Sequence, residues 1–424
     1  MNFLIAAACL LLGPPQEGAL SESKQKELDR KLSAWFTRTA AKGNAVDLSW
    51  PRFGKLSAEE HAEVKERAWH AYQEGSLAKK LVGEFKKRAI KSGKYTMPFS
   101  LQKRGKRPAD GWPVLIAMHG GGGVPKKVND SQWEIMKKYY RVTNCIYIAP
   151  RAPTDEWNGF YTGYIYPLVD RLIRALHLFE EVNPDRIYLI GYSHGGYGAF
   201  SIGPKMADRF AAVHASASAP TDGQSAAENL LNTHFSFRIG EHDTAYGRLK
   251  RCRAFNTEIE KLKKENPGFY PVTFEYMPGK AHVDLGDWTR PVGMFKERRK
   301  PTPKTIRWKV TDNIIQNFFW LRIESPKKGM DVLATVSKNR IDLTTTNVEK
   351  ITLRLPANFF PKNKRVVVTA NGKRVYSGIP KASLETLCKT LEERGDPSYI
   401  WDREIEVSIP KREVKETQKR SDNR

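Results

Sequence analysis

The spacing of hydrophobic positions changes twice along the chain, and each change marks a new region. Over residues 20–93 apolar residues recur at helical spacing, which predicts a helical extension. Over residues 94–300 short apolar runs such as "WPVLIAM" alternate with amphipathic patterns such as "YPLVDRLIRALHLFEEV". This alternation is typical of an α/β domain whose parallel sheet is covered by helices on both faces. Residues 301–410 hold short strand-like runs separated by Pro, Gly or Asn, and they predict an all-β, sandwich-like module.

Local signals refine these regions. Ser57 stands three residues before Glu60, the spacing of a capping box, and predicts the start of a helix. Asn371 and Gly372 lie between two β-rich runs and predict a two-residue hairpin turn. A helix is predicted over residues 383–393, inside the β module.

The two ends of the chain have compositions of their own. The apolar run within "MNFLIAAACLLLGPP" is too short to span a bilayer but suits the core of a secretory signal, so residues 1–19 are predicted to be a signal peptide. A buried N-terminal segment is the alternative. Residues 411–424 are polar and are predicted to form a disordered basic tail. The expected location is therefore outside the cytoplasm, either secreted or periplasmic.

The net charge of +24 points to acidic partners. Lys and Arg are spread along the whole chain, and no zinc-finger spacing or RNA-recognition motif is present. We therefore do not expect nucleic acid as the ligand, and we expect electrostatic attraction to anionic surfaces instead. Beyond the leader, Cys145, Cys252 and Cys388 show no metal-like spacing, and whether two of them form a disulfide stays open.

The segment "GYSHG" at residues 191–195 carries the clearest chemical signal. It matches G-x-S-x-G, a sharp turn from strand to helix that exposes the serine hydroxyl at the edge of a sheet. It follows the strand pattern "RIYLI" and precedes a helical pattern, which is the context the motif requires. Ser193 is therefore predicted to be a nucleophile.

A serine hydroxyl needs a base and an acid that holds the base. His282 lies in "MPGKAHVD", directly after the last predicted strand of the α/β region, and is the predicted base. Asp243 in "GEHD" follows the preceding strand and is the predicted acid, favoured over Glu241, with Asp222 in reserve. The order Ser, Asp, His along the chain is the one expected for this kind of sheet.

Two backbone N–H groups should face the oxyanion of the reaction intermediate. The first belongs to His194, directly after the nucleophile, and the second to the glycine run "HGGGG", at Gly121 or Gly122. The run lacks the Gly-Lys-Ser/Thr ending of a phosphate-binding loop, so a nucleotide is not indicated.

Candidate substrate contacts come from residues that border these motifs. Arg151 and Trp157 lie in "APRAPTDEWNGFYTG", after the second strand of the α/β region. His119 opens the glycine run, and Tyr192 directly precedes the nucleophile.

The motifs "MHGGGG", "VNPDRIYLIGYSHGGYGAF", "GEHD" and "PGKAH" together resemble the α/β-hydrolase fold. The region that carries them, about residues 94–300, is similar to secreted esterases related to poly(3-hydroxybutyrate) depolymerases and feruloyl esterases. The resemblance implies a serine carboxylesterase with an acyl-enzyme on Ser193, a small-molecule or polymeric ester substrate, no metal and no organic cofactor. It leaves the oligomeric state open.

Two alternatives stay open at this point. The segment "GYSHGGYGAF" also resembles prolyl-oligopeptidase-type serine peptidases. A non-catalytic binding protein with a hydrolase fold is the other alternative. In that case four aromatic residues of the β module would form either a binding face or simply part of its core; they are Trp308, Phe318, Phe319 and Trp320.

Overall fold

The computed structural model describes residues 19–38, 46–50, 53–361 and 363–410. The predicted signal peptide and the predicted basic tail lie outside these residues, apart from residue 19. Within the described ranges, no helix is both long enough and apolar enough to cross a membrane. Cys145, Cys252 and Cys388 are all buried free thiols.

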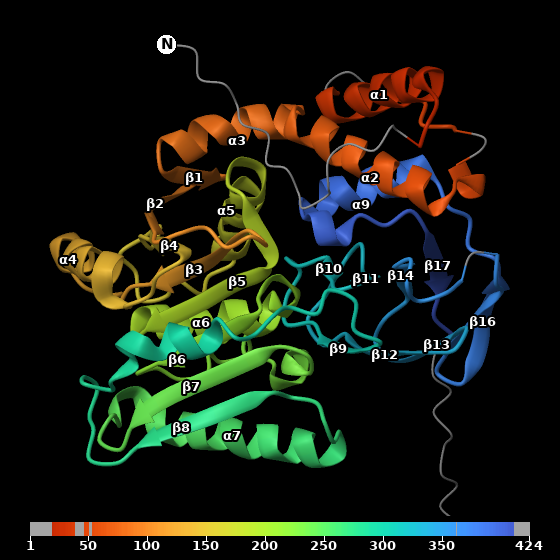
Figure 1. Cartoon of the computed structure of the whole chain (residues 1–424). Coiled ribbons are helices and arrows are strands. Elements are labelled where there is room, and N and C mark those ends of the chain that lie inside the picture. Colours follow the sequence, from red (N-terminus) through yellow and green to blue (C-terminus); the bar gives the residue numbers. More distant parts are fainter. Residues whose placement is uncertain (1–18, 39–45, 51–52, 362, 411–424) are drawn as a thin grey trace, which may run out of the picture.

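A sheet of eight strands forms the centre of the molecule, with the order β1-β2-β4-β3-β5-β6-β7-β8 (Figure 1). The strands are β1 (Ala89–Ser92), β2 (Tyr95–Arg104), β3 (Trp112–Met118), β4 (Cys145–Pro150), β5 (Val182–Tyr192), β6 (Ala212–Ser216), β7 (His234–Gly240) and β8 (Val272–Met277). β2 pairs antiparallel with both β1 and β4, and all later pairings are parallel. The chain therefore has the α/β-hydrolase fold, as its sequence predicts.

Helices cover both faces of this sheet because its central strands are apolar on both sides. In β3, Val114 and Ile116 belong to the core that also contains α5, α6 and α7. Leu115 and Ala117, the alternate positions, pack in the core that contains α4 and α8 on the other face. These helices are α4 (Lys126–Tyr139), α5 (Ile165–Phe179), α6 (His194–Lys205), α7 (Arg248–Glu265) and α8 (Arg290–Met294).

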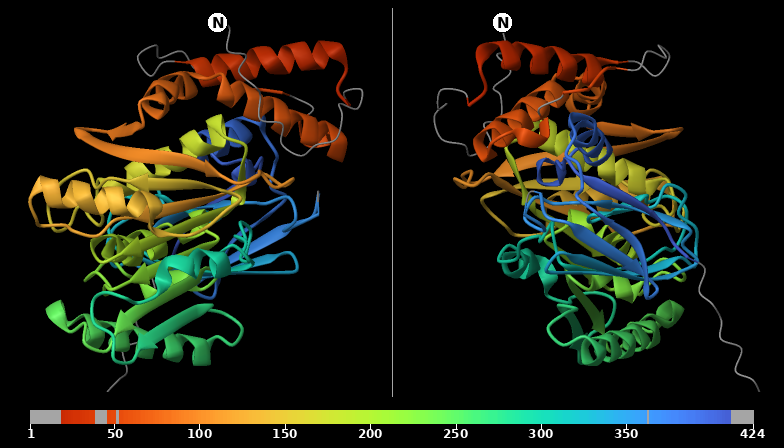
Figure 2. Two further views of the ribbon diagram at one scale, coloured as in Figure 1. Left: turned by 60° about the vertical axis from the view of Figure 1, so that its left-hand side comes forward. Right: turned by 90° about the vertical axis from the view of Figure 1, so that its right-hand side faces the viewer.

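The N-terminal helices form a layer that packs against a helix of the C-terminal region. They are α1 (Glu22–Thr37), α2 (Ala58–Gln73) and α3 (Ser76–Lys86), and Ser57 makes the predicted capping box at the start of α2. They share a core with α9 (Leu384–Arg394), which lies beneath them (Figures 1 and 2). The helical region is shorter than the predicted residues 20–93, because its end forms β1 of the central sheet.

Two smaller sheets make up the C-terminal β module, with the orders β16-β15-β13-β12-β9 and β10-β11-β14-β17. Their strands are β9 (Thr305–Lys309), β10 (Asn317–Phe318), β11 (Leu321–Arg322), β12 (Asp331–Ser337), β13 (Arg340–Thr346), β14 (Lys350–Arg354), β15 (Val366–Ala370), β16 (Lys373–Gly378) and β17 (Glu404–Ser408). Asn371 and Gly372 turn the chain between β15 and β16, both with positive φ, as predicted. The four aromatic residues considered as a binding face are buried and belong to the core of this module; they are Trp308, Phe318, Phe319 and Trp320.

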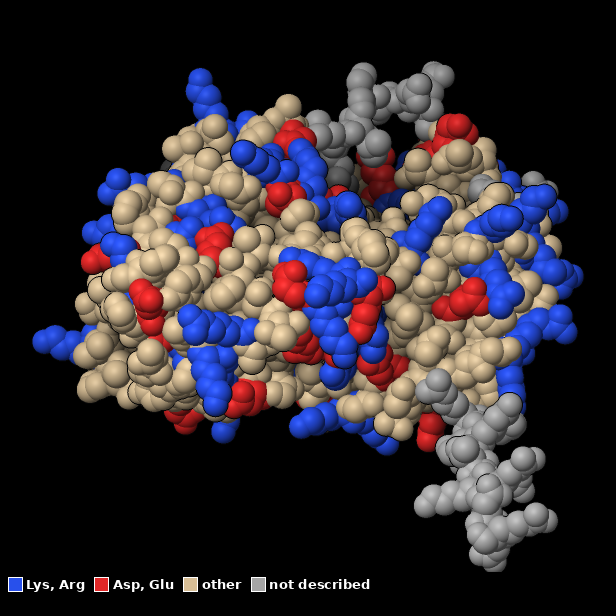
Figure 3. Space-filling model, turned by 90° about the horizontal axis from the view of Figure 1, so that it is seen from below, with Lys and Arg blue, Asp and Glu red and all other residues tan. Residues whose placement is uncertain are grey.

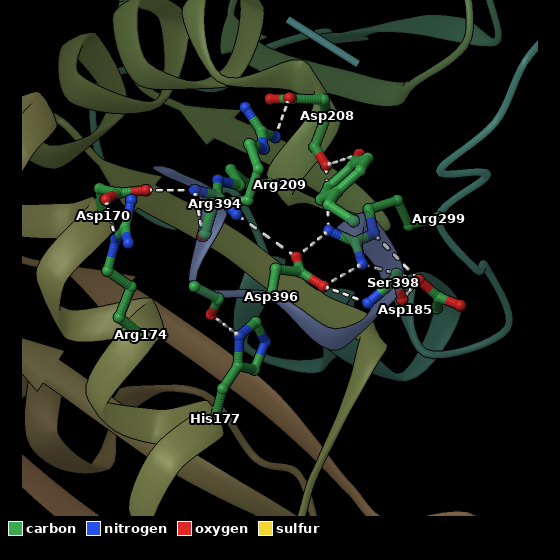
Figure 4. A network of polar contacts seen from close by, with 12 residues as sticks. Asp170, Arg174, His177, Asp185, Asp208, Arg209, Arg299, Arg394, Asp396 and Ser398 are labelled. Atoms are coloured by element: carbon green, nitrogen blue, oxygen red, sulfur yellow. Dashed lines mark hydrogen bonds and ion pairs between the residues drawn. The ribbon is translucent and has the colours of Figure 1, made fainter. Parts of the chain in front are cut away.

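A buried network of ion pairs joins the β module to the hydrolase domain (Figure 4). Arg299, just after α8, donates to Asp396, just after α9, at 2.7 Å. Arg394 at the end of α9 pairs with Asp208, which follows α6. Burial alone would raise the pKa of Asp396, but Arg299 and its neighbours lower it well below its usual value. The β module is therefore fixed to the hydrolase domain through charges that are paired and almost fully excluded from solvent.

Six short 3-10 segments complete the described secondary structure. They are η1 (Phe53–Lys55), η2 (Ala207–Arg209), η3 (Ala227–Leu230), η4 (Ala245–Gly247), η5 (Asp287–Thr289) and η6 (Pro397–Tyr399).

Candidate active site

Ser193 stands at the bend between β5 and α6 in a strained backbone conformation, with φ 52° and ψ −114°. Few residues other than glycine adopt a positive φ, and such strain is typical of functional turns. The neighbouring glycines make the bend possible. A Cβ atom at Gly191 would lie 2.0 Å from the Gly195 carbonyl oxygen, and one at Gly195 would lie 2.3 Å from that of Met118. The spacing of the motif is therefore a steric requirement of this turn.

The structure brings the three predicted triad residues together. His282 Nε2 lies 3.0 Å from Ser193 Oγ, and His282 Nδ1 lies 2.8 Å from Asp243 Oδ2. They come from the loops at the carboxyl ends of β5, β7 and β8, which lie close together in the sheet. Asp243 is buried, whereas the side chain of His282 is 36% exposed. A neutral imidazole whose Nδ1–H donates to Asp243 can accept a proton from Ser193 at Nε2.

Backbone contacts hold the loop after β8, which carries His282, beside the loop after β7, which carries Asp243. His242 N–H donates to Lys280 O at 2.8 Å, and a Cβ atom at Gly240 would lie 2.3 Å from Ala281 O. The Tyr192 hydroxyl donates to the carbonyl oxygen of His282. Tyr192, which was predicted to contact the substrate, therefore supports the loop that carries His282.

The two other candidate acids lie elsewhere. Glu241 accepts a hydrogen bond from Gly279 N–H at 2.7 Å, which folds the β8 loop. Asp222 pairs with Arg251, and its side chain is 95% exposed.

Arg248 is an unpredicted member of the cluster. It lies at the first position of α7, is 5% exposed, and donates from Nη1 to Asp243 Oδ1 at 2.8 Å. Burial would raise the pKa of Asp243, but the hydrogen bonds from His282 and Arg248 outweigh burial and lower this pKa below its usual value. In the sequence "GRLKRCR" nothing distinguishes Arg248 from its basic neighbours.

The predicted oxyanion donors are only partly available. The N–H groups of His194 and Gly121 have no hydrogen-bond partner among the described residues. The N–H of Gly122 instead donates to Asn129 Oδ1 at 2.8 Å. The prediction of Gly122 as an oxyanion donor is therefore wrong, because Asn129 of α4 occupies its N–H.

Gly122 has a packing role instead. A Cβ atom at this position would lie 2.9 Å from Cδ2 of the buried His194 ring. Burial lowers the pKa of His194 to about 3, so this ring is neutral at ordinary pH.

Two predicted substrate contacts are structural. His119 is fully buried: its Nε2 accepts from Ala152 N–H at 3.0 Å, and its Nδ1 donates to Gly120 O at 2.6 Å. The guanidinium of Arg151, also buried, pairs with Asp130 and Asp155. Both predictions are wrong, because the chain turns these polar side chains inward after β3 and β4 to fix the loops.

Trp157 faces an aromatic depression that also includes Tyr197, a residue of the first turn of α6. Its ring centroid lies 5.1 Å from that of Tyr246 and 5.4 Å from that of Tyr197. These rings, with Tyr161 and Arg251, line a cavity of about 280 Å³. Trp157 is 37% exposed, so a bound molecule can reach it. In the described ranges, no group of three or more His, Cys, Asp or Glu side chains is placed to hold a metal ion.

No family model and no curated protein matches the sequence. Solved structures do match. A thermostable esterase shares 17% identity over 50% of this chain and 62% of its own, with a TM-score of 0.41. A putative dipeptidyl aminopeptidase IV from Bacteroides ovatus ATCC 8483 shares 16% identity over 49% of this chain and 35% of its own, with a TM-score of 0.37. A ferulic acid esterase shares 17% identity over 48% of this chain and 93% of its own, with a TM-score of 0.34.

These matches contain the types of enzyme that the sequence motifs resemble, at low identity. The aligned part spans less than two thirds of each of the first two proteins. Similarity at this level identifies neither an activity nor a substrate for this chain.

Proposed function

We propose that this protein is a serine carboxylesterase that hydrolyses carboxylic esters through an acyl-enzyme on Ser193. The observation that carries the proposal is the continuous hydrogen-bond relay from Asp243 through His282 to Ser193, with distances of 2.8 and 3.0 Å. A relay of this geometry turns a weakly nucleophilic hydroxyl into a strong one.

In the proposed reaction, Ser193 Oγ bonds to the ester carbonyl carbon while His282 Nε2 takes the hydroxyl proton. The carbonyl oxygen becomes an oxyanion, and the N–H groups of His194 and Gly121 receive its charge. The bond to the alcohol then breaks, and the alcohol leaves with the proton from His282. A water molecule repeats these steps on the acyl-enzyme and releases the acid.

Charge and location complete the proposal. Figure 3 shows Lys and Arg spread over one face of the molecule with Asp and Glu among them. Such a surface suits weak attraction to anionic surfaces better than tracking of a nucleic-acid backbone. We also propose that residues 1–19 direct the export of the protein. The test is whether a mature chain that begins after residue 19 is found outside the cytoplasm.

The test of the activity is hydrolysis of p-nitrophenyl esters of acetate and butyrate by the full-length protein. Ser193→Ala should lower kcat by about a million-fold, because the nucleophile, base and acid act as a unit. Ser337→Ala, which changes an exposed serine at the end of β12, is the matched control and should retain full activity. Wild-type activity in Ser193→Ala would refute the acyl-enzyme on this residue.

Matched ester and amide substrates with the same acyl group separate the esterase from the peptidase. We expect hydrolysis of the ester and no measurable hydrolysis of the matched amide, because a serine peptidase would hydrolyse the ester as well. Turnover of the amide would instead favour the peptidase.

A further inference from the structure

The acid of the proposed triad is held by a buried cation that the triad scheme does not use. Asp243 Oδ2 accepts from His282, and Asp243 Oδ1 accepts from Arg248 Nη1, both at 2.8 Å. Each carboxylate oxygen therefore has a partner, and the carboxylate cannot rotate without breaking one of two charge-assisted hydrogen bonds.

Arg248 is itself anchored to the helix of the nucleophile. Its Nε donates to the hydroxyl of Tyr197 at 3.0 Å, and Tyr197 N–H donates to Ser193 O at 3.1 Å, in the first turn of α6. One guanidinium thus connects the loop after β7 with α6. Because a guanidinium presents several donors in a fixed plane, it can make both contacts at once.

The groups that face Asp243 make Arg248 its main source of positive charge. His282 comes from the β8 loop, Tyr192 from β5, Tyr197 from α6, and Arg248 and Cys252 from α7. The two tyrosines and the cysteine are neutral at ordinary pH, since burial raises the pKa of each. The imidazole is neutral before it takes the proton from Ser193. During that part of the cycle, the permanent positive charge beside the carboxylate is that of Arg248.

The contact between Arg248 and His282 agrees with this assignment. Arg248 Nη1 lies 3.3 Å from His282 Nδ1. A guanidinium cannot accept a hydrogen bond, so a proton on Nδ1 has Asp243 as its acceptor. The arginine therefore lies beside the acid–base hydrogen bond without replacing it.

We infer that Arg248 is a positioning residue of this site, which keeps Asp243 ionised and oriented toward His282 Nδ1. The inference rests on the proposed function and deepens it by adding a fourth side chain to the relay. Arg248 acts through Asp243 and does not need to touch the substrate.

The test compares Arg248→Met, Arg248→Lys and the wild type in p-nitrophenyl butyrate hydrolysis over a range of pH. Arg248→Met removes a hydrogen bond to a charged group, which predicts a fall in kcat of about 10- to 100-fold with little change in KM. It should also move the acid limb of the kcat profile to higher pH, because Asp243 loses the contact that lowers its pKa. Arg248→Lys should restore the position of the acid limb, since the charge returns, but only part of kcat.

Arg253→Met is the matched control, because Arg253 is an exposed arginine of the same helix. It should keep the wild-type kcat and pH profile. Arg248→Met with wild-type kcat and an unmoved acid limb would overturn the inference, as would an equal loss in Arg253→Met.

If Arg248→Met does not fold, Tyr197→Phe decides the question. It removes the anchor of the guanidinium and leaves the ion pair with Asp243. The inference then expects a smaller fall in kcat and a smaller shift of the acid limb in the same direction, and a wild-type profile overturns it. An inactive wild-type protein would refute the proposed function together with this inference, whereas an active wild type with an indifferent Arg248 refutes the inference alone.

Discussion

Two groups of ion pairs lie at opposite ends of β5. One consists of carboxylates paired with arginines, whereas the other also contains a histidine that contacts a serine. Near the start of the strand, Asp185 pairs with Arg299, which also binds Asp396 (Figure 4). These residues belong to the junction network, the set of ion pairs that joins the β module to the hydrolase domain and also contains Asp208 and Arg394. Just beyond the end of the strand, Ser193 meets the cluster of Asp243, Arg248 and His282. In the junction network each of the carboxylates of Asp185, Asp208 and Asp396 is paired with at least one guanidinium group.

The active-site cluster differs from the junction network in one respect. His282 has one nitrogen on Asp243 and the other directed at the Ser193 hydroxyl, and its side chain is partly open to solvent. A buried ion pair by itself therefore only holds parts of the structure together. It takes part in chemistry where a side chain that can both accept and donate a proton lies between a carboxylate and a hydroxyl.

The largest expected effect concerns the active-site cluster. Asp243→Asn keeps the shape of the side chain but removes the charge that selects the Nδ1–H tautomer of His282. By analogy with serine hydrolases, kcat should fall about 10⁴-fold, measured by p-nitrophenyl butyrate hydrolysis. Thermal unfolding should show that the variant still folds. Wild-type activity in Asp243→Asn would show that the carboxylate near Ser193 has no more part in the reaction than those of the junction network.

The same substitution in the junction network should have the opposite outcome. Asp396→Asn removes one buried counter-charge from Arg299 and Arg209, which keep their pairs with Asp185 and Asp170. Breaking a buried ion pair typically costs about 3–5 kcal/mol of unfolding free energy. Urea unfolding measures this loss. The activity of the folded fraction should be unchanged, because Asp396 lies at the far end of β5 from the site. If stability stayed at the wild-type value, the network would not hold the β module in place.

The smallest effect of a single group is the dependence of stability on pH that comes from His119, a buried neutral histidine. Burial lowers the pKa of His119 to about 4, whereas an unfolded histidine has a pKa of about 6.5. The unfolded state therefore binds the proton first, and stability is lost as the pH falls from about 6.5 to about 4. Each pH unit of this range costs about 1.4 kcal/mol per histidine.

Urea unfolding at several pH values between these limits measures this slope. His70→Gln, which changes a partly exposed histidine of α2, should leave the slope unchanged. A stability that stays constant over the range would contradict the assignment of His119 as a neutral, buried residue.

The sequence predicts the candidate site best where each functional residue directly follows a strand. Ser193, Asp243 and His282 each follow a recognisable apolar strand, so their positions at one edge of the sheet could be predicted from the order of elements. The fold was predictable for the same reason, since continuous apolar strands and amphipathic helices alternate over most of the domain.

Residues that act through another residue gave no such signal. Arg248 binds Asp243, and Asn129 holds Gly122 N–H, but each stands inside an ordinary helical pattern. His119 and Arg151 follow apolar strands as functional residues do, yet their side chains turn inward to bind loops. The sequence shows where the chain leaves the sheet, but it does not show which way a side chain then points.

The junction network was equally hidden. Arg394 and Asp208 are 186 residues apart in a chain with 71 basic residues, so no spacing marks this pair among the others. Their pairing depends on how α9 packs against the hydrolase domain, which is a property of the tertiary structure.

Mass spectrometry of the protein after reaction with a fluorophosphonate probe shows whether Ser193 is the nucleophile. Cleavage after Arg186 and Lys205 releases one peptide that contains both Ser193 and Ser201, so fragmentation must locate the adduct. We expect a single adduct on Ser193 in the wild type, with much slower labelling in Asp243→Asn. A folded wild-type protein without an adduct, or with one on another residue, would contradict this role of Ser193.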